Sequence, residues 1–132
     1  LLKIAGVERL ALVTPYTGDI QQRIVANYAR EGIAVVAERH MHISVNHDFA
    51  LVEPDTLLHL MREVSTHAND ARPQAISTYC TNLRAAPLAD RMEAELGIPL
   101  LDTVSATFWG GLRAAGADPS QVQGWGSLFA MR

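Results

Sequence analysis

Four short apolar segments, separated by stretches with helical periodicity, are the feature that most constrains the fold of this chain. They comprise residues 8–13, 33–37, 75–79 and 98–101. Their length, and the β-branched residues they contain, are typical of buried parallel strands. Strands that alternate with helices form βαβ units with right-handed crossovers. We therefore predict an α/β fold, in which a parallel four-stranded sheet is flanked by helices.

The segments between and after these strands predict four helices. They cover residues 17–32, 54–69, 83–96 and 105–115. Gly32, Gly97 and Gly116 are expected to end three of them, because glycine readily adopts the left-handed conformation of a helix cap. Residues 39–52 are polar and rich in histidine, without a clear period. We expect a long loop there with at most a short helical turn, and such loops are often functional.

Composition argues against several partners and compartments. Eleven Lys and Arg against 14 Asp and Glu give a net charge of −3, and no basic stretch is suited to a phosphate backbone, so we expect no nucleic acid partner. No apolar run approaches the roughly 20 residues of a membrane span, so we expect a soluble, cytoplasmic protein without a membrane partner. The single cysteine cannot form an internal disulfide. Because the chain begins with Leu1 and a strand follows almost at once, we expect a piece of a longer protein.

Two residues capable of chemistry follow predicted strands. Ligands of parallel sheets gather outside the carboxyl ends of the strands, where Tyr16 follows the first segment and Cys80 the third. A thiol at the start of a helix meets unpaired N–H groups, which favour the thiolate. Such a sulfur can move a proton at carbon or add to an activated double bond. Thr81, Asn82 and the Tyr16 hydroxyl are suitable neutral donors for a carboxylate or enolate.

Structural interpretations of the same residues remain open at this point. Free cysteine is often simply buried, and a tyrosine after proline is often a packed turn residue. His40, His42 and His47 carry imidazoles near one another in the sequence, but no carboxylate or cysteine at ligand spacing completes a set. We therefore expect no metal site.

Several motifs together resemble the Asp/Glu racemase superfamily, in its branch of maleate cis-trans isomerases and arylmalonate decarboxylases. The motifs are Val13-Thr14-Pro15-Tyr16, Cys80-Thr81-Asn82-Leu83, Leu96-Gly97-Ile98-Pro99-Leu100-Leu101 with Ser105 and Trp109, and Gly124-Trp125-Gly126-Ser127-Leu128-Phe129. They follow the family's order and cover nearly the whole chain. The resemblance implies one Rossmann-like lobe of a two-lobe enzyme, with residues 1–116 as the lobe that carries the cysteine. Residues 117–132 are then a tail expected to pack on a first lobe outside this chain.

The resemblance also implies roles for individual residues. Cys80 corresponds to the second-lobe cysteine, which acts as an acid, a base or a nucleophile. Tyr16 corresponds to the hydroxyl that binds a substrate carboxylate, and Thr14, Thr81 and Asn82 would help to bind the same substrate. No cofactor is expected.

Three reactions remain open, together with one non-catalytic alternative. Cys80-Thr81-Asn82 looks closer to the isomerases, so cofactor-independent isomerisation of a small dicarboxylate such as maleate is our first hypothesis. Arylmalonate-type decarboxylation is second and amino-acid racemisation third. This sequence does not separate the three reactions, because the deciding position lies in the other lobe. A non-catalytic α/β binding or interaction module is the competing class. Either a homo-oligomer or a first-lobe partner is expected.

Overall fold

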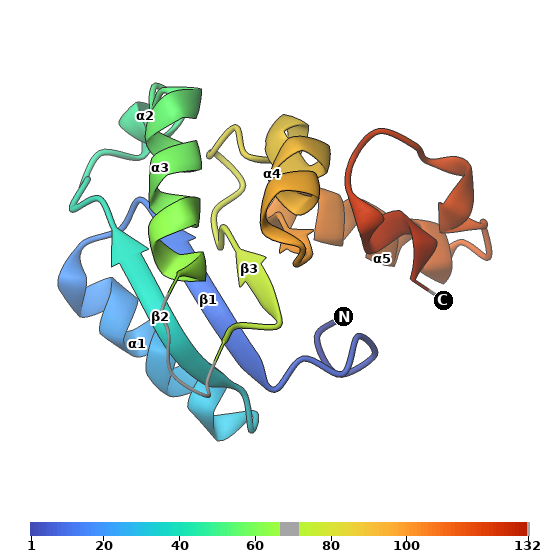
Figure 1. Ribbon diagram of the computed structural model, residues 1–132, viewed down its shortest axis with the longest axis horizontal. Helices are drawn as coiled ribbons and strands as arrows, with labels where there is room; N and C mark the ends of the chain where they lie inside the picture. Colours follow the sequence, from blue (N-terminus) through green and yellow to red (C-terminus); the bar gives the residue numbers. More distant parts are fainter. Residues whose placement is uncertain (67–71, 132) are drawn as a thin grey trace.

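A computed structural model describes residues 1–66 and 72–131, and a sheet of four parallel strands forms the centre of this part of the chain (Figure 1). The strands are β1 (Arg9–Thr14), β2 (Ala34–His40), β3 (Ala75–Ser77) and β4 (Leu100–Leu101). Their order in the sheet is β2-β1-β3-β4, and each neighbouring pair is parallel. The predicted α/β fold with a parallel four-stranded sheet is therefore confirmed.

Helices cover both faces of the sheet. The α-helices are α1 (Gly18–Arg30), α2 (Asn46–Phe49), α3 (Pro54–Ser65), α4 (Ala89–Leu96) and α5 (Thr103–Ala114). The 3₁₀ helices are η1 (Ala86–Leu88), η2 (Pro119–Gln121) and η3 (Ser127–Ala130). Helices α3 and α4 pack on one face, whereas α1 and α5 pack on the other (Figure 1).

Strand β1 explains why the first apolar segment is continuous rather than alternating. Ala11 and Val13 belong to the cluster under α3 and α4, whereas Leu10 and Leu12 belong to the cluster under α1 and α5. All four are fully buried, because successive side chains of a strand point to opposite faces and both faces are covered. Burial of each larger aliphatic side chain stabilises the fold by about 1.5–3 kcal/mol.

The region from the end of β2 to α3 differs from the prediction in where its elements begin and end. Strand β2 continues to His40, which pairs with Thr14 of β1, so the predicted loop begins later than residue 39. The short helical turn expected within residues 39–52 is confirmed as α2. Helix α3 ends at Ser65, while its predicted end near Asn69 lies outside the described residues.

The C-terminal segment packs on this lobe through η3. Leu128 and Phe129 are buried in the same cluster as Trp109 of α5. The Trp109 Nε1–H donates to the carbonyl of Met131 at 3.2 Å, and the backbone N–H of Ser127 donates to Glu93 Oε2 of α4 at 2.7 Å. A contact of residues 117–132 with a first lobe stays a prediction. None of the helices in the described part of the chain has the length and apolar character needed to cross a membrane.

Candidate active site

The loops that follow β1 and β3 form the candidate site. These two strands are neighbours, with Leu12 paired to Ser77, so the chain leaves the sheet at adjacent points. From β1 the chain proceeds to β2 on one side of the sheet and later returns to β3 on the other. Ligands of open α/β sheets bind at such a switch point, outside the carboxyl ends of the strands. This topology brings Tyr16 and Cys80 together.

The hydroxyl of Tyr16 lies within interaction range of the Cys80 thiol, and Tyr16 packs against the apolar cluster that contains Cys80. Cys80 is 5% exposed and Tyr16 is half-buried. Burial, followed by the hydrogen bond with Cys80 and negative charge on Cys80 and Tyr79, raises the pKa of Tyr16 to about 12. The phenol is therefore protonated near neutral pH and can donate a hydrogen bond to an anion beside the sulfur.

The predicted helix over residues 83–96 begins later than expected, so Cys80 does not lie at the start of a helix. Residues 81–85 form a loop, and helical structure begins with η1 at Ala86. Pro87 explains the difference: it has no N–H, and its ring is tolerated in the first turn of a helix but not farther inside. Helical structure that begins at Ala86 places this proline at the very start of its first turn. The hydrogen-bonding group beside the sulfur is thus a phenol rather than a helix N-terminus.

Helix α2 touches both loops of the site. The ring of its Phe49 packs edge-on against Tyr16, with 5.5 Å between the ring centroids. At its other end, the side-chain oxygen of Asn46 accepts a hydrogen bond from Asn82 Nδ2 at 2.8 Å. Asn82 and Thr81 are both exposed, so their polar groups lie at the accessible rim of the site. The sequence predicts a long polar loop around Asn46, but a segment without a period gives no reason to select this residue.

Thr14 is the last residue of β1 and lies at the beginning of the loop that carries Tyr16. It is fully buried, and its hydroxyl donates to Gln21 Oε1 of α1 at 2.6 Å. Gln21 Nε2 in turn donates to Glu38 Oε2 at 2.9 Å, and the same oxygen pairs with His40 Nδ1 at 2.8 Å. Thr14 therefore belongs to a polar relay between β1, α1 and β2. Gln21 could have been identified from the sequence, because it is a polar residue on the apolar face of the predicted helix over residues 17–32.

Asp102 contacts the residue that directly follows β3, and its role was not predicted from the sequence. Its side chain is fully buried, and it caps α5 by accepting from the backbone N–H groups of Val104 at 2.8 Å and Ser105 at 3.2 Å. It also accepts from the Thr78 hydroxyl at 2.9 Å. Burial raises the pKa of Asp102, although these hydrogen bonds oppose the shift. An aspartate directly between a strand and a helix is the available sequence signal for such a cap.

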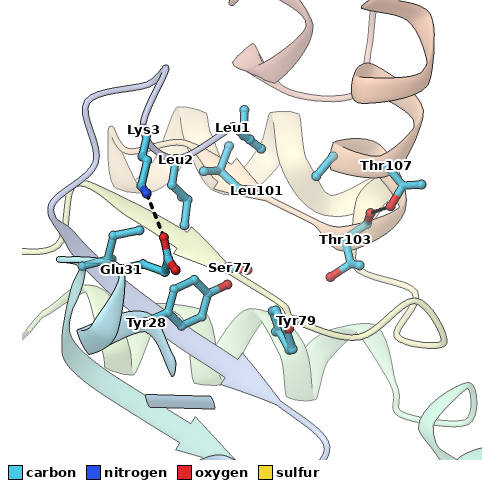
Figure 2. A pocket seen from close by; sticks show the side chains of 12 residues that line it. Leu1, Leu2, Lys3, Tyr28, Glu31, Ser77, Tyr79, Leu101, Thr103 and Thr107 are labelled. Atoms are coloured by element: carbon cyan, nitrogen blue, oxygen red, sulfur yellow. Dashed lines mark hydrogen bonds and ion pairs between the residues drawn. The ribbon is translucent and has the colours of Figure 1, made fainter. Parts of the chain in front are cut away.

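A separate cavity of about 540 Å³ lies between α1 and α5 (Figure 2). Tyr28 and Tyr79 line it with 5.8 Å between their ring centroids, and the Lys3–Glu31 ion pair lies at its edge. Burial raises the pKa of Tyr28 to about 12, opposed by a hydrogen bond with Ser77. The lining includes neither Cys80 nor Tyr16. Its residues are mainly apolar and hydroxyl-bearing, so the cysteine chemistry belongs to the loops described above.

The histidines considered as metal ligands do not converge on one point with acidic residues. The rings of His40 and His42 lie 4.3 Å apart between centroids, whereas His47 neighbours Asp48 on α2. Across residues 1–66 and 72–131, no group of three or more His, Cys, Asp or Glu side chains is arranged to hold a metal ion.

Comparisons with known proteins agree with the parallel α/β fold described above. The family model described as arylmalonate decarboxylase matches residues 1–129. The arylmalonate decarboxylase of Bordetella bronchiseptica is 30% identical over 97% of this chain and 52% of its own length, and the maleate isomerase of Nocardia farcinica is 27% identical over 97% of this chain and 49% of its own. This chain thus spans about half the length of the curated relatives it matches.

Solved structures give the same result. A maleate isomerase variant from Pseudomonas putida S16 with maleate has a TM-score of 0.89 and 27% identity, over 98% of this chain and 50% of that chain. A match of this quality over nearly all residues agrees with the parallel sheet and its order. With the family model matching residues 1–129, from the first residue into η3, the chain belongs to the arylmalonate decarboxylase family.

Proposed function

We propose that this chain carries the cysteine half of a cofactor-independent enzyme acting on a small dicarboxylate. Cys80 is the group that attacks or protonates carbon, and Tyr16 binds one substrate carboxylate. The observation that carries the proposal is the pairing of the Cys80 thiol with the protonated phenol of Tyr16 at the switch point of the sheet. Such a pair offers a reacting sulfur and a fixed hydrogen-bond donor for the same anion.

Maleate cis-trans isomerisation is the reaction we favour. The Cys80 thiolate adds to one olefinic carbon, a C–S bond forms, and the electron pair moves onto the adjacent carboxylate to give an enediolate. Rotation about the former double bond follows. The electron pair then returns, the C–S bond breaks, and fumarate leaves with the thiolate restored. Tyr16 donates a hydrogen bond to the enediolate, and the exposed Thr81 and Asn82 bind at its rim.

Arylmalonate decarboxylation is the second candidate, favoured by the family model and by the 30% identity to the Bordetella bronchiseptica enzyme. Here the C–C bond to one carboxylate breaks, carbon dioxide leaves, and the electron pair forms an enediolate. The Cys80 thiol then protonates that carbon. Both reactions pass through an enediolate beside one sulfur, so the same hydrogen-bond donors serve either.

A paired activity and labelling experiment tests the proposal. The intact protein that contains this chain is incubated with maleate and, separately, with phenylmalonate, and products are followed by proton NMR for wild type and Cys80→Ser. We expect fumarate from maleate, or phenylacetate from phenylmalonate, and loss of at least about 100-fold in Cys80→Ser. In parallel, iodoacetamide labels Cys80 with and without each dicarboxylate. Labelling that neither dicarboxylate slows, together with no turnover, would instead favour a non-catalytic module.

A further inference from the structure

His42 adopts an unusual backbone conformation beside the Tyr16 loop. Within residues 1–66 and 72–131 it is the one non-glycine residue with a positive φ, at 56°. For residues other than glycine this left-handed region is unfavourable by about 1–3 kcal/mol, although histidine enters it more readily than most. The surrounding contacts must therefore maintain it.

The conformation allows three backbone hydrogen bonds to the loop that carries Tyr16. The N–H of Met41 donates to Thr14 O at 3.1 Å, that of His42 to Tyr16 O at 3.1 Å, and that of Ile43 to Pro15 O at 2.9 Å. The acceptors are not in sequence order. The chain must therefore change direction at His42 to make all three bonds, which an extended residue there would prevent.

The side chain of His42 connects this turn to the polar relay behind the loop. Its ring lies 4.3 Å from that of His40, between centroids, and His40 is bound to Glu38. Gln21 links Glu38 to the hydroxyl of Thr14. The loop from Thr14 to Tyr16 is thus held through side chains at its beginning and through backbone carbonyls along its length.

We infer that His42 is a positioning residue whose left-handed backbone conformation fixes the Tyr16 loop and so keeps the phenol against the Cys80 thiol. The inference deepens the proposed function and rests on it for the meaning of that contact. The role belongs to the backbone of His42, because the three hydrogen bonds involve no side-chain atom of this residue.

A set of substitutions separates the backbone from the imidazole. His42→Asn and His42→Gly remove the ring but tolerate a positive φ, whereas His42→Val disfavours it strongly. His59→Val on the exposed face of α3 is the matched control for the same change of side chain. Two properties are measured: the ring resonances of Tyr16 and Tyr28 in ¹³C-tyrosine NMR, and the protection of Cys80 by maleate or phenylmalonate against iodoacetamide.

We expect His42→Val to shift the Tyr16 resonance, leave that of Tyr28 in place, and weaken dicarboxylate protection by at least about tenfold. His42→Asn, His42→Gly and His59→Val should stay within about twofold of wild type.

A purely structural role would lower the melting temperature but leave the folded-state Tyr16 resonance unchanged, and this would overturn the inference. Equal effects of Asn, Gly and Val would also overturn it, because the ring would then be responsible. If no dicarboxylate protects wild-type Cys80, the proposed function fails while the Tyr16 resonance still decides the positioning role.

Discussion

The hydroxyl of Tyr16 meets the thiol of Cys80 because the strands that precede them, β1 and β3, are neighbours in the sheet although β2 lies between them in the sequence. The phenol is held from three directions: by the ring of Phe49, by the thiol, and by backbone bonds from residues 41–43. A donor fixed in this way needs little reorganisation when negative charge develops beside the sulfur.

Tyr16→Phe should weaken the binding of a dicarboxylate with little effect on folding. The substitution keeps the ring that packs against Phe49 and removes the hydroxyl beside Cys80. Hydrogen bonds to charged groups contribute about 1.5–3 kcal/mol, so we expect at least about tenfold weaker protection of Cys80 by maleate or phenylmalonate. The measurement is the alkylation rate against dicarboxylate concentration. Tyr28→Phe, in the separate cavity between α1 and α5, is the matched control, and equal protection in both variants would remove Tyr16 from the site.

The sequence allowed prediction of the features that depend on local pattern. Four apolar segments with helices between them specify a parallel sheet, and Gly97 and Gly116 both have the left-handed conformation expected after a helix. The carboxyl ends of β1 and β3 identified Tyr16 and Cys80 as candidates. That these two meet follows from the strand order, which places β1 beside β3.

The parts that escaped prediction depend on long-range contacts. Asn46 was hidden in a loop without a period, and its meeting with Asn82 depends on how α2 packs. Asp102 combines a local helix cap with a contact to Thr78, which directly follows β3, and only the cap has a sequence signal. Near Cys80, the helix was predicted from residue 83, whereas helical structure begins at Ala86, directly before Pro87.

Asp102→Ala should be strongly destabilising, whereas Asp102→Asn should not. Alanine removes the cap of α5 and leaves the buried Thr78 hydroxyl without its partner, for a combined loss of about 2–4 kcal/mol. Asparagine caps equally well. Burial raises the pKa of Asp102 above its unfolded value, so its stability contribution falls as pH rises through the folded pKa, and folding disfavours the charged form.

Urea denaturation at pH 7 measures both Asp102 variants. We expect Asp102→Asn within about 1 kcal/mol of wild type. Equal losses in the two variants would mean that the charge itself stabilises the fold, contrary to the raised pKa.

Gly126→Ala should release the C-terminal segment, whereas Gly97→Ala should be a mild change. Both glycines have positive φ, 88° and 68°, so either substitution introduces backbone strain of about 1 kcal/mol. A Cβ at Gly126 would also lie 2.9 Å from the Cβ of Ala89 on α4, whereas nothing lies within 4 Å at Gly97. We expect an additional loss of about 1–3 kcal/mol for Gly126→Ala.

Urea denaturation and tryptophan fluorescence follow these two variants. Trp109 packs with Leu128 and Phe129, so release of the segment should shift its emission to longer wavelength in Gly126→Ala before global unfolding. Coincident transitions and equal stability of the two variants would argue against tight packing of η3 on α4.

The two tyrosines with raised pKa values predict a loss of stability at alkaline pH. The pKa is about 12 for Tyr16 and for Tyr28 in the folded protein, against 10.0 for an unperturbed phenol. Between these values the unfolded chain has released both protons while the folded protein retains them. The stabilisation is therefore complete below pH 10 and is lost as pH rises from 10 to 12.

Tyr28→Phe should remove about half of this pH dependence, since Tyr16 still titrates. Urea midpoints at pH 9, 10 and 11 test it, and parallel curves for wild type and Tyr28→Phe would contradict the raised pKa of Tyr28.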